Sequence, residues 1–157
     1  MRNEKLEDEI VLPALLRHAR VTYGSAMRRA LEEAGYDDVP KNGMYVIGGL
    51  ALEGLEIPLS QLIRELRVSK QVAGQLVDAL VLRGYLERTV DAEDRRKLSI
   101  TLTERGRAAA ATQAKARKKV DSELLKRVSL EDVRRTRRTL SALIDIGCEV
   151  NGEGDVS

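Results

Sequence analysis

Apolar residues recur at helical spacing along most of the chain, a pattern that predicts a mainly α-helical fold. The first helical segment covers residues 6–34 and ends at Gly35. Pro13 lies within it, so either the helix begins near Leu12 with the proline in its first turn, or a longer helix kinks or divides there. We favour the kinked or two-piece helix.

Two shorter helices are expected over residues 40–52 and 59–66, separated by an extended piece at Leu55–Ile57. The first of them contains three glycines, Gly43, Gly48 and Gly49. Each glycine costs up to roughly 1 kcal/mol against alanine, so this helix needs packed neighbours to persist.

The next helix carries both a start signal and a stop signal. Ser69 can cap it by accepting a hydrogen bond from an N–H of the first turn, and Gly84 ends it. Its apolar stripe faces inward and comprises Ala73, Leu76, Val77 and Leu80. The residues on or near the outer face of its first turns are Lys70, Gln71, Gly74 and Gln75.

Two β-type runs follow, Leu86–Val90 and Leu98–Leu102. The segment between them, residues 91–97, is highly polar, so the pair predicts a hairpin with a long charged tip.

Two longer helices complete the pattern. Thr103 can cap the first, which should cover about residues 104–127. Residues 129–132 resemble a capping box and begin the second, which should end at Gly147. Residues 151–157 are expected to be disordered. Because no linker divides these elements, we expect residues 1–150 to form a single domain.

The composition excludes several classes of protein. The chain has 157 residues and 43% of them are hydrophobic, which is enough for one folded domain. One cysteine (Cys148) and one histidine (His18) exclude a disulfide scaffold and a Cys/His zinc site. There is no run of 18 apolar residues and no signal peptide, so we expect a cytoplasmic chain that does not enter a membrane.

Basic charge is concentrated in the second half of the chain. Overall, 27 Lys and Arg stand against 25 Asp and Glu, but residues 98–138 hold 12 basic residues and 5 acidic ones. This distribution suits an anionic polymer as partner. From charge alone, a solvated helix face is the more frequent explanation.

The order of the elements predicts a function. A short helix, a turn, a capped second helix and a hairpin together make a winged helix-turn-helix. The second helix of such a unit fits the major groove of DNA, and the hairpin reaches phosphates or the minor groove. Arg95, Arg96 and Lys97 cluster at the hairpin tip, where arginine is attracted by a narrow minor groove. A merely solvated turn is the alternative for the tip alone.

The stretch from Asp94 to Gly106 (DRRKLSITLTERG) resembles the wing signature of the MarR-type winged-helix regulators. That signature is Asp-x-Arg, three residues, an aliphatic residue, x, Leu-Thr, two residues and Gly. Residues 59–66 and 76–86 are similar to the family's helices before the wing. The resemblance covers about residues 10–147.

The resemblance implies a fold, a set of DNA contacts and a brace within the wing. It implies a mainly α fold with a DNA-binding part at about residues 37–103 and dimerisation helices at about 6–35 and 104–147. In such proteins the aspartate of Asp-x-Arg braces the arginine that enters the minor groove, here Asp94 and Arg96. The candidate DNA-binding residues are Ser69, Lys70, Gln71, Gly74, Gln75, Asp94, Arg95, Arg96 and Lys97. Each glutamine can pair with adenine, whereas a phosphate is the expected partner of Lys70.

The sequence departs from the family pattern at three positions. Ala92 stands where a proline is frequent, and Gly74 and Gln75 stand where Ser and Arg are frequent. Base preference therefore cannot be copied from relatives.

The partners expected are double-stranded DNA, a second copy of the chain and a small-molecule effector. Apolar residues on the terminal helices favour a homodimer that reads a pseudo-palindromic operator, and a ligand-responsive repressor is the expected role. The resemblance implies an effector pocket, for which Arg20, Tyr23, Met44 and Ile47 are the candidates.

No enzyme motif is present, so we expect neither catalysis nor a cofactor nor a metal. The alternative function is a helical protein–protein interaction module that keeps the winged fold without specific DNA binding.

Overall fold

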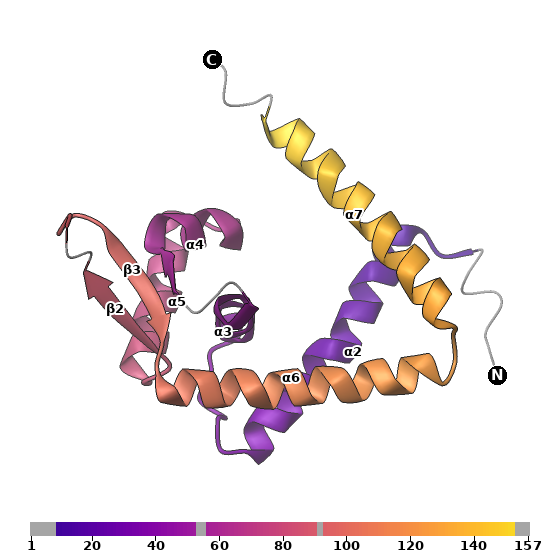
Figure 1. The fold of residues 1–157 in the computed structure, drawn as a ribbon, viewed down its shortest axis with the longest axis horizontal. Coiled ribbons are helices and arrows are strands. Elements are labelled where there is room, and N and C mark those ends of the chain that lie inside the picture. The colour runs from indigo at the N-terminus through magenta and orange to yellow at the C-terminus, as the bar shows by residue number, and fades with distance from the viewer. Residues whose placement is uncertain (1–8, 53–55, 91–92, 153–157) are drawn as a thin grey trace. The chain divides into compact units, whose positions relative to one another are not determined.

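The structure, a computed structural model, describes residues 9–52, 56–90 and 93–152. It is mainly helical, as the apolar periodicity predicts (Figure 1). The helices are α2 (Leu12–Glu33), α3 (Gly43–Leu52), α4 (Leu59–Leu66), α5 (Lys70–Leu82), α6 (Glu104–Leu125) and α7 (Leu130–Gly152). The strands are β1 (Glu56–Pro58), β2 (Leu86–Val90) and β3 (Leu98–Leu102).

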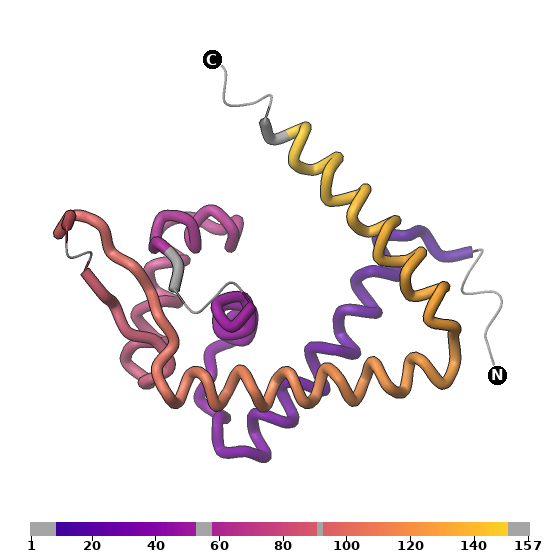
Figure 2. Tube along the Cα trace, viewed as in Figure 1, coloured from indigo at the N-terminus to yellow at the C-terminus, as the bar shows by residue number. Residues whose placement is uncertain are grey.

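The chain forms two compact units, residues 1–118 and residues 119–157. The first unit contains α2 to α5, the strands and most of α6, which continues directly from β3 (Figure 2). The second unit holds the end of α6 and all of α7.

The expected hairpin is present and belongs to a three-stranded antiparallel sheet in the order β1-β3-β2. Strands β2 and β3 pair with Leu86 opposite Leu102 and Arg88 opposite Ile100. The extended piece expected near residues 55–57 is β1, and it pairs with the other edge of β3, Ile57 opposite Ile100. This third strand ties the segment before α4 to the wing.

One apolar core lies in the first unit. Its largest fully buried side chains come from α2, α3, α5, the sheet and the turn before β2, and include Leu31, Ile47, Leu80, Ile100 and Tyr85. Ala73 and Val77 of α5 are also fully buried, and Leu76 packs against the core. The predicted inward stripe of α5 is therefore confirmed, and its opposite face is left exposed.

The predicted helix starts are confirmed by hydrogen bonds. The chain turns through Arg67, which has a left-handed backbone (φ 51°), and Ser69 Oγ then accepts from Val72 N at 3.2 Å. Thr103 Oγ1 accepts from Gly106 N at 3.0 Å at the start of α6. Ser129 and Asp132 exchange bonds at the start of α7, with Asp132 N donating to Ser129 Oγ at 3.1 Å.

The two ends of the chain differ from the expected boundaries. Helix α2 begins at Leu12 with Pro13 in its first turn, which is the arrangement that we did not favour from the sequence. Before it, Glu9 is helical and the chain bends at Ile10, and the rest of the expected first piece lies outside the described residues. Helix α7 continues past the expected end at Gly147 to Gly152, because one glycine weakens a helix without breaking it. Residues 151 and 152 are therefore helical, and residues 153–157 of the expected tail lie outside the described residues.

Candidate nucleic-acid interface

The outer face of α5 carries the predicted recognition residues. Lys70, Gln71 and Gln75 are exposed, and Gly74 is half-buried beside them. A Cβ added at Gly74 would meet no atom within 4 Å, so this glycine is not required by packing. The cap at Ser69 fixes the first turn, so the polar side chains start from a defined backbone.

Val72 belongs to the same exposed face and is absent from the sequence-based prediction. Its side chain is 47% exposed, although its neighbour Ala73 is fully buried. The apolar spacing gave no clear signal, because Val72 lies four residues before Leu76 and so falls at the margin of the inward stripe.

An ion pair between Arg88 and Asp78 joins the wing to α5. Asp78 lies three residues after Gln75 on exposed helix surface, and Arg88 lies on β2. The guanidinium neutralises a carboxylate close to the polar face of α5 and ties the strand to that helix. The sequence offered no signal for this pair, since neither residue belongs to a motif.

The wing tip is described from residue 93 onward, so Ala92 lies outside the described residues. Arg95, Arg96 and Lys97 are all exposed there, as predicted. The carboxylate of Asp94 accepts from the backbone N–H of Arg96 at 3.0 Å, and the Asp94 carbonyl accepts from the N–H of Lys97 at 3.0 Å. Asp94 therefore holds the main chain at Arg96, and the brace on the Arg96 guanidinium stays a prediction.

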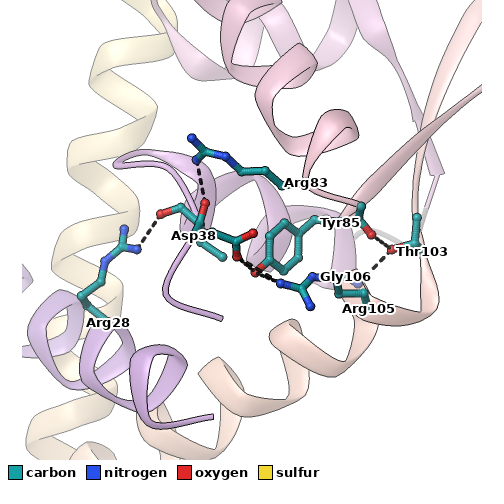
Figure 3. A network of polar contacts seen from close by, with 9 residues as sticks. Arg28, Asp38, Arg83, Tyr85, Thr103, Arg105 and Gly106 are labelled. Carbon is teal, nitrogen blue, oxygen red and sulfur yellow. Dashed lines mark hydrogen bonds and ion pairs between the residues drawn. The ribbon is translucent and has the colours of Figure 1, made fainter. Parts of the chain in front are cut away.

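A polar cluster fastens the winged part of the first unit to the loop between α2 and α3 (Figure 3). The Tyr85 hydroxyl donates to the carboxylate of Asp38, and Arg105 Nη2 donates to the same carboxylate at 3.1 Å. Arg105 also lies 4.7 Å from the centre of the Tyr85 ring and 5.4 Å from that of Tyr36. Three segments far apart in the sequence thus meet at one tyrosine.

Burial of its ring, with the hydrogen bond to Asp38, raises the pKa of Tyr85 to about 12. The hydrogen bond from Tyr85 in turn lowers the pKa of Asp38. Arg83 and Arg28 reinforce the loop by donating to the carbonyls of Asp38 and Val39 at 2.6 and 2.8 Å.

The four candidate effector residues do not line the pocket described below. Met44 and Ile47 are buried in the core. Arg20 Nε donates to the Tyr45 hydroxyl at 3.0 Å and its guanidinium lies 4.5 Å from the centre of that ring. Tyr23 is half-buried on α2.

A pocket of about 330 Å³ lies in the first unit between α3 and α6. Small and apolar residues form most of its wall, and two arginines and one amide are its polar groups. Its lining residues are Gly48, Ala51, Leu52, Leu102, Arg107, Ala110, Ala111, Gln113, Ala114 and Arg117. Arg107 Nη1 donates to the Leu102 carbonyl at 2.9 Å, which fixes that side chain at the wall.

The side chains that could bind a metal ion do not form a cluster among the described residues. His18 is exposed on α2 and Cys148 is exposed on α7. Among the described residues, no three His, Cys, Asp or Glu side chains are grouped so as to hold a metal ion. None of the helices in the described part of the chain has the length and apolar character needed to cross a membrane.

Comparison with known proteins agrees with this geometry. Residues 44–97 match the sequence model of the MarR family, a segment that includes α3 to α5 and most of the wing. No curated protein sequence matches the chain at a significant level.

Solved structures match over nearly the whole chain. A crystal structure of MarR superimposes with a TM-score of 0.74 at 20% identity, covering 93% of this chain and 97% of that one. Streptococcus pneumoniae FabT in complex with DNA gives 0.71 at 18% identity, covering 89% and 99%. A mutant E. coli MarR complexed with operator DNA gives 0.68 at 19% identity, covering 88% and 96%. Residues 44–97 therefore match the MarR family model, and the chain has the winged-helix fold of the MarR structures.

Proposed function

We propose that this chain is a transcriptional regulator that binds double-stranded DNA sequence-specifically as a homodimer, and not an enzyme. The observation that carries the proposal is the exposed face of α5, where a capped first turn presents Lys70, Gln71 and Gln75, beside a wing tip that presents Arg95 and Arg96. Glutamine amides on a helix can read adenine edges in the major groove, while tip arginines meet phosphates or the minor groove.

Two of the similar structures support a DNA partner. FabT was solved with DNA and the E. coli MarR mutant with operator DNA, and each covers most of this chain. In this proposal α5 lies in the major groove, and the nine predicted contact residues are divided between the start of α5, with its cap Ser69, and the wing.

Exposed apolar side chains on the terminal helices support the homodimer. At the start of α2 and on it these are Val11, Leu12 and Val21, and on α7 they are Leu130, Leu143, Ile144, Ile146 and Val150. A second copy of the chain covers the exposed side chains of each helix most simply. Two-fold symmetry then requires a pseudo-palindromic operator whose half-sites lie about one helical turn, roughly 34 Å, apart.

The α3–α6 pocket supports a response to a small molecule and hence the role of a ligand-responsive repressor. Its apolar wall suits a small ring, and Arg107 and Arg117 suit a carboxylate. In this proposal the effector binds in this pocket, and not at the four residues that the sequence predicts. Benzoate is a suitable probe, and its binding should be lost in Arg107→Ala or Arg117→Ala.

The test of the proposal is a titration of the full chain against a mixed-sequence duplex at several salt concentrations. DNA binding through phosphate contacts should weaken steeply as salt rises, because binding releases counterions. Replacing Arg95, Arg96 and Lys97 together by alanine should make that dependence shallower. If the chain does not bind the duplex even at low salt, the alternative function applies, a protein–protein interaction module with a winged fold.

A further inference from the structure

The exposed face of α5 combines two amides with one aliphatic side chain. Gln75 lies three residues after Val72 and four after Gln71, so its side chain is a helical neighbour of both over the first two turns. All three are exposed, and Val72 is 47% exposed.

The core does not need Val72. The buried contacts of α5 are made by Ala73, Val77 and Leu80, each fully buried. Valine is also a weaker helix former than the straight-chain residues beside it. Neither packing nor helix propensity therefore accounts for a valine at this position.

Val72 is also held in a fixed place. Its backbone N–H donates to Ser69 Oγ at 3.2 Å, so it is the residue that the cap fixes. A β-branched side chain has few χ1 rotamers, which leaves its two methyl groups in a defined direction. Such a group offers a preformed apolar contact and no hydrogen bond.

In the major groove one base is marked by an apolar group. Thymine carries a C5 methyl, whereas cytosine presents an N4 amino donor that an aliphatic contact would leave without a partner. The adjacent glutamines suit adenine, which pairs with thymine. An amide–valine–amide face therefore matches a run of A·T pairs.

We propose that Val72 is a specificity-determining residue that contacts the C5 methyl of a thymine next to an adenine read by Gln71 or Gln75. This assignment rests on the proposed function, because it requires α5 to lie in the major groove. It adds a base preference for thymine over cytosine at one step of each half-site.

The test uses a duplex recovered from random sequences by binding to the full chain, with each thymine replaced in turn by deoxyuridine. This change removes one methyl and keeps every hydrogen-bonding group. The parent protein should lose about three- to fivefold in affinity at one thymine of each half-site, as expected for one buried methyl. Val72→Ala should bind the thymine duplex less tightly and no longer respond to that deoxyuridine.

Two further variants make the result specific. Val72→Ile keeps the aliphatic contact and should keep the response. Leu82→Ala removes the most exposed apolar side chain of the same helix, 87% exposed, at its far end, and should leave both affinity and response unchanged.

The proposal is overturned if no thymine responds, or if Val72→Ala responds to deoxyuridine as strongly as the parent. If no duplex is recovered at all, the proposed function itself fails and this inference fails with it. In the first two outcomes a duplex is still recovered, so sequence-specific binding stands and only the role of Val72 fails. The failure of this inference is therefore distinguishable from the failure of the proposed function.

Discussion

Two helical glycines experience opposite environments. A Cβ added at Gly106 would lie 2.1 Å from the carbonyl oxygen of Tyr85, whereas one added at Gly74 would meet nothing within 4 Å. In the interior of a helix, alanine is normally more favourable than glycine by up to about 1 kcal/mol. At Gly106 the clash with backbone should reverse that preference.

Gly106→Ala should therefore lower the free energy of unfolding by about 1–3 kcal/mol, as overpacking does. Gly74→Ala should raise it by up to about 1 kcal/mol and serves as the matched control. Urea unfolding followed by circular dichroism measures both. A Gly106→Ala variant as stable as the parent would show that α6 can move away from Tyr85.

Asp94 offers a second test at the scale of one residue. Its carboxylate accepts from the backbone N–H of Arg96, so alanine at position 94 should loosen the tip. Asp94→Ala should weaken binding to the recovered duplex by several-fold, although it removes a negative charge. Asp94→Asn keeps an acceptor oxygen and should bind at least as tightly as the parent.

Comparing Asp94→Ala with Asp94→Asn distinguishes the loss of the hydrogen bond to the Arg96 backbone from the loss of the negative charge. Anisotropy titrations at fixed salt give both affinities. Simple charge repulsion predicts that both variants bind more tightly, and tighter binding by Asp94→Ala would contradict the brace. Arg96→Ala should cost more affinity than Arg95→Ala, and it should lower the salt slope by about one.

At the scale of elements, the cluster around Tyr85 joins the α2–α3 loop to β2 and α6. The pKa of Tyr85 rises from the usual 10.0 to about 12 in the fold. Between these values the folded chain keeps a proton that the unfolded chain has lost, so stability falls as the pH rises through this window.

From pH 9 to pH 11 the parent should lose about 1 kcal/mol of unfolding free energy through this one group. Tyr85→Phe removes the titrating hydroxyl and is the control, because the other groups titrate in both proteins. Urea unfolding at the two pH values measures the difference. Equal losses in the parent and in Tyr85→Phe would mean that Tyr85 titrates normally.

The elements themselves could be predicted because their signals are local. Periodicity and caps located α4, α5 and the β2–β3 hairpin, and the caps at Ser69 and Thr103 form bonds within three residues. The outer face of α5 followed from the inward spacing of its apolar residues.

Contacts between distant segments could not be predicted in this way. Tyr85 and Asp38 are 47 positions apart, and Arg105 and Asp38 are 67 apart. The hydrophobic pattern does not predict which edge of the sheet β1 joins. It also does not predict that Arg88 forms an ion pair with Asp78. The pocket between α3 and α6 likewise depends on how two helices separated in sequence pack together.

At the scale of the whole molecule, α7 provides a test of the homodimer. Ile144 is 62% exposed, so a lysine there should not disturb the single chain. Ile144→Lys should give a monomer at micromolar concentration, since it would place a charge in an apolar interface. Asp145→Lys changes the adjacent exposed residue and should remain dimeric.

Sedimentation velocity distinguishes these outcomes. The parent and Asp145→Lys should sediment as dimers. A monomeric parent at micromolar concentration would contradict the two-fold arrangement on DNA, and a dimeric Ile144→Lys would place the interface on another surface.

In the proposed complex, two copies of α5 read DNA across a two-fold axis. The decisive experiment is the selection of bound fragments from a pool of random duplexes at one stated salt concentration. We predict enrichment of two inverted half-sites whose centres lie about 34 Å, one helical turn, apart. A pool that stays random after repeated rounds, or that converges on a single half-site without a symmetric partner, would contradict the account.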